Sequence, residues 1–441
     1  MASLRSQLIS VYLGEGFREL RRTWYRARRG RRRRLIYVHQ VDDPYGINVV
    51  QRLDRLLACE EFDFELRILP PTGPAFAPDR RRLQRWALRD AARQAQTHEL
   101  DFPKSPRHPG PLAIDRALSH ALALESAPPS VALKALRDLA LALFDADASE
   151  LPSLPSASLV PDPVEARRRL DANTERVHAQ GHYQGAMVAY EGEWYWGLDR
   201  LPLLGARLAD EGVPVPRELL ERPAPFVARR ESNAGEMSTR AKLEFFFSFR
   251  SPYSYLAFRR VRALAERHGV ELEMRLVLPM VMRGLQVPRL KRLYMARDCA
   301  RVAAIERIPF GRIADPLGRG VERCMAIADF AASEGRLLEW IDCASTAIWS
   351  RGIDTADDDS LRELVVEAGL DPHAALATTR ASEAAWRDAA ERNRLALLDM
   401  GLWGVPCFRF GALELWGQDR IDVLDVALAS GRTAGPAGAL I

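Results

Sequence analysis

The sequence has few of the features that mark secreted or membrane-spanning proteins. Its five cysteines are scattered and form no Cys-x-x-Cys pair, so neither a disulfide framework nor a zinc knuckle is expected. No uninterrupted run of about 18 apolar residues occurs, which argues against a spanning helix. The opening residues, MASLRSQLIS, lack the long apolar stretch of a secretory signal. We therefore expect a cytoplasmic protein with no transmembrane segment and no metal.

The composition is that of a folded protein with more than one domain. Hydrophobic residues make up 47% and charged residues 28% of the 441 residues, close to globular averages. A chain of this length accommodates roughly two to three domains. Disordered, collagen-like and coiled-coil architectures are therefore excluded.

Positive charge is concentrated at the start of the chain. Residues 1–34 contain eleven arginines against two glutamates, a net charge of +9, so the rest of the chain carries −5 of the total of +4. The segment predicts an amphipathic helix. Such a helix could pack on its own domain, or contact an anionic membrane surface or a nucleic acid. Its apolar residues are Leu4, Leu8, Ile9, Val11, Tyr12, Phe17, Leu20 and Trp24.

One sequence pattern occurs twice. Residues 35–45 and 243–253 are apolar runs that end in Pro-Tyr and precede a helical pattern. Residues 186–200 and 406–420 each predict a β-hairpin, with Gly192 or Gly411 in the turn, that leads into Gly-x-Asp-Arg. Long helical patterns fill both intervals, which predicts a tandem duplication of one α/β unit. The expected parts are a basic segment 1–34, a first domain 35–210, a linker 211–240, a second domain 241–430 and a tail 431–441.

The second copy carries six ordered segments of one known family. It resembles the 2-hydroxychromene-2-carboxylate isomerases and the related kappa-class glutathione transferases. The resemblance implies two tandem thioredoxin-like domains, each with a DsbA-like helical insertion, the first being degenerate. The segments are FFFSFRSPYSYLAF at 245–258, LKRLYMARDCAR at 290–301, IPFGRIADPLGRGVER at 308–323, AIWSRGIDTADD at 347–358, AGLDP at 368–372 and GLWGVPCFRFGALELWGQDRIDVL at 401–424.

Ser251 is the candidate catalytic residue. It begins the Ser-Pro-Tyr-Ser turn at a predicted helix start, where backbone N–H groups favour negative charge. A serine followed by proline is also a good helix N-cap, so capping alone would account for it. The resemblance implies that the Ser251 hydroxyl binds the thiolate of glutathione.

The resemblance places the remaining glutathione contacts near the end of the copy and on one earlier helix. Val405 would pair its backbone with glutathione beside a cis-proline at Pro406, and Gln418 with Asp419 would receive the ammonium group. Lys291 would lie near the glycine carboxylate. A carboxylate at a helix start and a surface lysine are the plainer interpretations of Asp419 and Lys291.

Other positions are less specific. The isomerases have an asparagine in the loop before the lysine, but here Leu285 follows Gly284. Cys407 follows the proline and is expected to be buried and inert, with a redox role as the alternative. Five aromatic residues either line a substrate pocket or belong to the core: Phe249, Tyr253, Tyr255, Trp349 and Trp403.

The first copy departs from the pattern. Asp43 replaces the serine and Ala186 replaces the proline, and a carboxylate there would repel a thiolate. We therefore expect this copy to be non-catalytic. Binding of another ligand, or of a metal, around His39, Asp42, Asp43 and His182 is the alternative.

Three functions remain for the chain. The first is a glutathione-dependent isomerase or transferase, in which the bound thiolate adds reversibly to a conjugated, aromatic-derived substrate. The second is a thiol–disulfide oxidoreductase, which the absence of cysteine from both turns disfavours. The third is a binding or scaffold module without redox activity. A homodimer is compatible with each.

Overall fold

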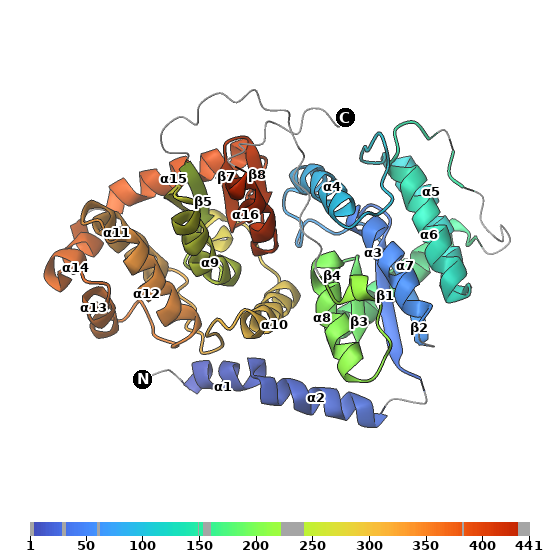
Figure 1. Cartoon of the computed structure of the whole chain (residues 1–441), viewed down its shortest axis with the longest axis horizontal. Coiled ribbons are helices and arrows are strands. Elements are labelled where there is room, and N and C mark those ends of the chain that lie inside the picture. The colour runs from blue at the N-terminus through green and yellow to red at the C-terminus, as the bar shows by residue number, and fades with distance from the viewer. Residues whose placement is uncertain are drawn as a thin grey trace. The chain divides into compact units, whose positions relative to one another are not determined.

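The computed structural model describes residues 4–28, 32–59, 62–148, 150–152, 160–221, 242–381 and 383–430. The chain divides into two compact units, each with a four-stranded sheet and covering helices (Figure 1). Of the described residues, the first unit holds 20–221 and 288–294, and the second holds 4–19, 242–287 and 295–430. The predicted mixed α/β class is confirmed.

The first unit is built around a mixed sheet with the strand order β2-β1-β3-β4. β1 runs parallel to β2 and antiparallel to β3, and β4 is antiparallel to β3. Six consecutive residues of β1 are buried, as expected for a central strand covered on both faces. The elements are β1 (Arg34–Gln40), α3 (Tyr45–Leu57), β2 (Asp63–Leu69), α4 (Arg80–Thr97), α5 (Pro111–Ala123), η1 (Leu124–Ser126), α6 (Pro129–Phe144), α7 (Pro163–Ala179), β3 (Met187–Tyr190), β4 (Glu193–Trp196), α8 (Gly197–Asp210) and η3 (Arg217–Leu219).

The second unit contains a sheet of the order β6-β5-β7-β8. β5 is again parallel to one neighbour and antiparallel to the other. The elements are β5 (Lys242–Phe247), α9 (Pro252–His268), β6 (Glu271–Leu276), η4 (Met280–Arg283), α10 (Arg289–Ile305), α11 (Arg319–Ser333), α12 (Leu337–Trp349), α13 (Asp358–Glu367), α14 (Pro372–Ala381), α15 (Glu383–Asp399), β7 (Cys407–Phe410), β8 (Leu413–Trp416), η5 (Gln418–Arg420) and α16 (Ile421–Ala429). The first turns of α10 belong to the first unit.

The two sheets have the same strand order and the same strand directions. Each ends in the hairpin that the sequence predicts, and Gly192 and Gly411 in the turns adopt φ of 78° and 58°, a region that glycine enters without steric strain. A tandem duplication would produce two units with the same sheet topology, as found here. The duplication itself stays a prediction.

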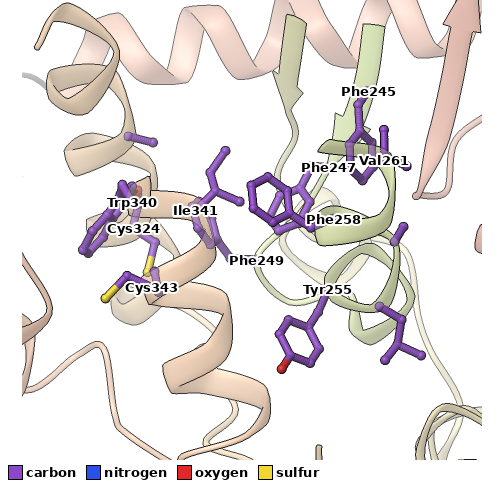
Figure 2. Packing of buried hydrophobic residues seen from close by; sticks show 14 of the residues in the cluster. Phe245, Phe247, Phe249, Tyr255, Phe258, Val261, Cys324, Trp340, Ile341 and Cys343 are labelled. Carbon is purple, nitrogen blue, oxygen red and sulfur yellow. Dashed lines mark hydrogen bonds between the residues drawn. The ribbon is translucent and has the colours of Figure 1, made fainter. Parts of the chain in front are cut away.

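Local signals explain where α9 begins and ends. Ser251 caps its first turn, Pro252 occupies the first helical position, and Gly269 ends it in the left-handed conformation with φ 64°. The buried side of α9 packs against β5 and the inserted helices. Figure 2 shows Phe247, Phe249 and Phe258 in contact within this core, to which Trp340 of α12 also belongs.

The predicted linker is partly structured. Val213 and Leu219 are buried in the core of the first unit, so the chain leaves that unit later than residue 211. Residues 222–240 and the predicted tail 431–441 lie outside the described residues. The predicted basic segment forms two helices, α1 (Leu4–Leu13) and α2 (Glu15–Arg28). Within the described part of the chain, no helix combines the length and apolarity needed to cross a membrane.

Candidate functional site

The start of α9 holds a half-buried hydroxyl in two hydrogen bonds. The Oγ atom of Ser251 accepts from the backbone N–H of Ser254 at 3.1 Å, which is the N-cap interaction that the turn predicts. The same oxygen donates to the carbonyl oxygen of Val405 at 3.3 Å. The Ser251 side chain therefore both caps α9 and contacts the backbone at Val405.

The peptide bond between Val405 and Pro406 is cis, as the family resemblance implied. Pro406 is buried and Val405 is half-buried. The carbonyl oxygen of Pro406 accepts from the N–H of Gly417 at 2.9 Å, so the residues after β8 are held next to the proline. The structure thus brings the Ser251 turn, the proline and the start of η5 together.

Gln418 and Asp419 follow Gly417 directly. The Gln418 amide donates to the Asp419 carboxylate, and its carbonyl oxygen accepts from Arg260 of α9 at 2.8 Å. Arg260 was not predicted as a site residue. The sequence gives no signal that separates it from its exposed neighbour Arg259. It fixes the side chain of Gln418 from the helix that Ser251 begins.

Comparison with known proteins finds a family that is similar to the part of the chain that contains the Ser251 turn. Residues 242–429 match the family described as DSBA-like thioredoxin domain. Residues 242–429 are thus similar to this family, and we refer to them below as the DSBA-like domain.

The DSBA-like domain is similar to proteins named 2-hydroxychromene-2-carboxylate isomerase. The protein of that name from Sphingobium xenophagum is 29% identical over 193 residues, covering 42% of this chain and 95% of the relative. The one from Pseudomonas putida is 26% identical over 194 residues, with 42% and 93% covered. A solved structure of 2-hydroxychromene-2-carboxylate isomerase aligns with a TM-score of 0.37 at 23% identity, covering 43% of this chain and 95% of its own.

Lys291 is held by a contact within the first unit. It lies in the part of α10 that belongs to the first unit, and its Nζ donates to the carbonyl oxygen of Phe76 at 3.0 Å. Burial lowers the pKa of the Lys291 amine. In this structure the Lys291 ammonium is bound to Phe76, and its role at a glycine carboxylate stays a prediction.

Most of the aromatic candidates are core residues. Phe249, Tyr255 and Trp349 are buried in the hydrophobic cluster of the DSBA-like domain (Figure 2 labels the first two). The Trp349 indole donates to the carbonyl oxygen of Phe249 at 3.0 Å, and the Tyr255 hydroxyl donates to a backbone carbonyl at 2.6 Å. The structure therefore favours the core interpretation of these three over the pocket interpretation.

The other two aromatic candidates are Tyr253, which lies in the Ser-Pro-Tyr-Ser turn, and Trp403, which lies two residues before Val405. Tyr253 is half-buried, and its hydroxyl donates to the Oδ2 atom of Asp298 at 2.8 Å. Trp403 is buried with its ring centroid 5.0 Å from that of Trp416. Its carbonyl oxygen accepts from Arg283 at 2.8 Å. Arg283, which was not predicted as a site residue, comes from the loop in which the sequence departs from the isomerases.

Cys407 is an unsuitable redox group. It is fully buried, its Sγ donates to the carbonyl oxygen of Gly404 at 3.0 Å, and burial raises its pKa well above that of an ordinary thiol. A thiol held in this form is a poor nucleophile, because the thiolate is the reactive species. The expectation that Cys407 is buried is confirmed.

The corresponding turn of the first unit has a different chemistry. Asp43 stands before α3, and its Oδ1 accepts from the N–H of Tyr45 at 3.1 Å. Burial raises the pKa of the Asp43 carboxyl from 3.8 to about 7, and the carboxylate of Asp42 adds to the rise. Ala186, at the position of the proline, has φ 50°. This turn therefore lacks both the hydroxyl and the proline of the DSBA-like domain.

The candidate metal ligands of the first unit are engaged separately. His39 shares a hydrogen bond with the hydroxyl of Tyr37 at 2.9 Å, and Asp42 pairs with Arg80 at 2.8 Å. The ring of His182 stacks on that of Trp194. Across the described residues, no group of three or more His, Cys, Asp or Glu side chains is placed to hold a metal ion.

Proposed function

We propose that the DSBA-like domain is a glutathione-dependent isomerase or transferase whose bound thiolate lies at Ser251. The observation that supports this most directly is the position of the half-buried Ser251 hydroxyl, at the start of a 17-residue helix and 3.3 Å from Val405. The relatives named 2-hydroxychromene-2-carboxylate isomerase support an isomerase as the kind of enzyme.

The residues at the turn fit a thiolate ligand. The helix start presents a positive end, and Ser251 supplies a hydroxyl proton that could donate to a sulfur anion. Val405 supplies a half-buried backbone segment of the type to which a peptide-like ligand pairs. The one cysteine adjacent to the proline, Cys407, is protonated and buried, so it does not compete for that role.

Each group then has a defined task. Bound glutathione would supply the thiolate that adds to a conjugated double bond and is released unchanged once the substrate has isomerised. Ser251 stabilises that thiolate, and Val405 and Asp419 orient the tripeptide that carries it. Gln418 is held by Arg260, which keeps the neighbouring Asp419 in place.

Turnover measurements test the proposal. The full chain is incubated with 2-hydroxychromene-2-carboxylate with and without glutathione, and isomerisation is followed by absorbance. Turnover that depends on glutathione is expected. Turnover at the same rate without any thiol, or thiol-dependent reduction of insulin in place of isomerisation, would contradict it.

A binding module without catalysis is the second candidate. It is favoured by Lys291, whose amine donates to Phe76 in the first unit. If Lys291 stays bound to Phe76, glutathione would lack this contact, and the domain could keep its fold without binding the cofactor. Absence of any glutathione binding by the full chain would favour this candidate.

A further inference from the structure

The basic N-terminal helix α2 is attached to the first unit by its polar side. The Nε and Nη2 atoms of Arg22 donate to the two carboxylate oxygens of Glu193 at 3.1 and 3.0 Å. Glu193 is buried and also accepts from the hydroxyl of Tyr195 at 2.7 Å. Because a bidentate hydrogen-bonded contact fixes the rotation of a helix about its axis, the Arg22–Glu193 pair determines which side of α2 faces outward.

The outward side of α2 is apolar. Phe17, Leu20 and Trp24 follow one another at helical spacing and expose 38%, 66% and 47% of their surface. A surface helix normally turns its apolar stripe toward the core and its charges toward water. Here the arrangement is reversed.

The helix α1 shows the same reversal. Leu4, Leu8 and Val11 recur at helical spacing and are 73%, 63% and 65% exposed. Its buried side carries Ser6 and Leu13. Each of the two helices therefore exposes an aliphatic or aromatic stripe.

Positive charge lies beside the α2 stripe. Arg26 and Arg28 are exposed, and the guanidinium carbon of Arg28 lies 4.0 Å from the ring centroid of Trp24. Residues 1–34 as a whole carry a net charge of +9. Exposed Trp, Phe and Leu next to arginines are the chemistry of helices that lie in the interface of an anionic bilayer.

We propose that α2 binds the surface of an anionic lipid bilayer through its apolar stripe. A second copy of the chain is a poorer occupant, since pairing would bring two segments of +9 together. A nucleic acid would neutralise the arginines but provides no apolar phase for Leu20 and Trp24. An anionic bilayer provides negative headgroups for the arginines and an apolar phase for Leu20 and Trp24.

Co-sedimentation with vesicles tests this proposal on the full chain. Vesicles of phosphatidylcholine mixed with phosphatidylglycerol are compared with vesicles of phosphatidylcholine alone. Leu20→Lys with Trp24→Lys removes the stripe while adding positive charge, and it should weaken binding to the mixed vesicles at least about tenfold. Leu112→Lys with Val164→Lys is the matched control at exposed apolar positions of α5 and α7, and it should bind like the wild type.

Four results would overturn the proposal. The wild type could fail to sediment with the mixed vesicles, or the Leu20→Lys, Trp24→Lys variant could bind them as well as the wild type. Size-exclusion chromatography could show a dimer that this variant dissociates, which would assign the stripe to self-association. RNA could bind equally to the wild type and to the Leu20→Lys, Trp24→Lys variant while vesicles bind neither protein, which would assign the segment to nucleic acid. The circular dichroism of both variants should match the wild type, because all four positions are exposed.

Discussion

The hydroxyl of Ser251 lies 3.3 Å from the carbonyl oxygen of Val405, a residue 154 positions further along the chain. A hydroxyl has one proton, and here that proton is directed at a backbone carbonyl. Binding of a thiolate would require the proton to turn toward the sulfur while the oxygen continues to cap Ser254. Ser251 can therefore keep its N-cap interaction while it binds a thiolate. Its hydrogen bond to the carbonyl oxygen of Val405 is the one that the thiolate replaces.

Replacement of Ser251 separates capping from catalysis. Ser251→Ala should lower glutathione-dependent kcat/KM by about 10- to 100-fold, because a hydrogen bond to a charged group contributes about 1.5–3 kcal/mol. It should also lower the free energy of unfolding by about 0.5–2 kcal/mol through loss of the cap. Ser251→Thr, which keeps the hydroxyl, should retain most of both.

Asp357→Ala is the matched control for that experiment. Asp357 caps α13 by accepting from the N–H of Ser360 at 2.8 Å. Its loss removes an N-cap of the same domain without touching the Ser251 turn. Equal losses of activity in Ser251→Ala and Asp357→Ala would show that the serine acts only through stability.

The stability of the first unit should depend on the ionisation of Asp43. The pKa of this carboxyl is raised from 3.8 to about 7, so its neutral form is favoured in the folded state. The stabilisation of the folded state that this preference provides is fully present below about pH 4 and is lost as the pH rises through about 7. Between pH 5 and pH 8 the Tm of the wild type should fall by a few degrees more than that of Asp43→Asn. An equal fall in both proteins, measured by circular dichroism, would contradict the assignment.

Loss of the Glu193 carboxylate should detach α2. Glu193→Gln removes the charge that Arg22 contacts through two nitrogens, at an expected loss of about 1–3 kcal/mol. Hydrogen exchange of the backbone amides in residues 15–28 should then become faster, as the helix opens more often. Glu165→Gln, which breaks the exposed pair with Arg168, should leave exchange in these residues unchanged. Unchanged protection of α2 in Glu193→Gln would show that this contact does not hold the helix.

The five thiols should react unequally with Ellman's reagent. Cys59 is exposed and the other four are buried. Burial raises the pKa of Cys324 and of Cys343 to about 12 and that of Cys407 well above the usual range. One thiol should therefore react rapidly in the native protein at neutral pH and five after unfolding. Fast reaction of Cys407, identified by labelling and peptide mapping, would revive a redox role.

Local signals in the sequence were sufficient for much of the fold. Ser-Pro predicted the start of α9, and glycine in a turn predicted both hairpins, because each signal acts over a few residues. Pro406 was predicted to be cis from the family resemblance, and it is. The start of α9 and the two hairpins depend on short stretches whose conformation is set locally.

Long-range contacts were beyond prediction. Lys291 is bound by a backbone carbonyl, that of Phe76, and any residue at position 76 would supply the same carbonyl. The pattern of α2 indicated two faces but not which one is attached. That depends on Glu193, which in the sequence resembles an ordinary polar residue beside a hairpin turn.

Calorimetric titration of glutathione into the full chain tests the central claim most directly. The wild type should bind glutathione with a Kd of about 1 mM or lower, and Ser251→Ala should bind it at least about tenfold more weakly. Isotherms that are identical for the wild type and Ser251→Ala, or no heat of binding in the wild type, would contradict the assignment of the thiolate to Ser251.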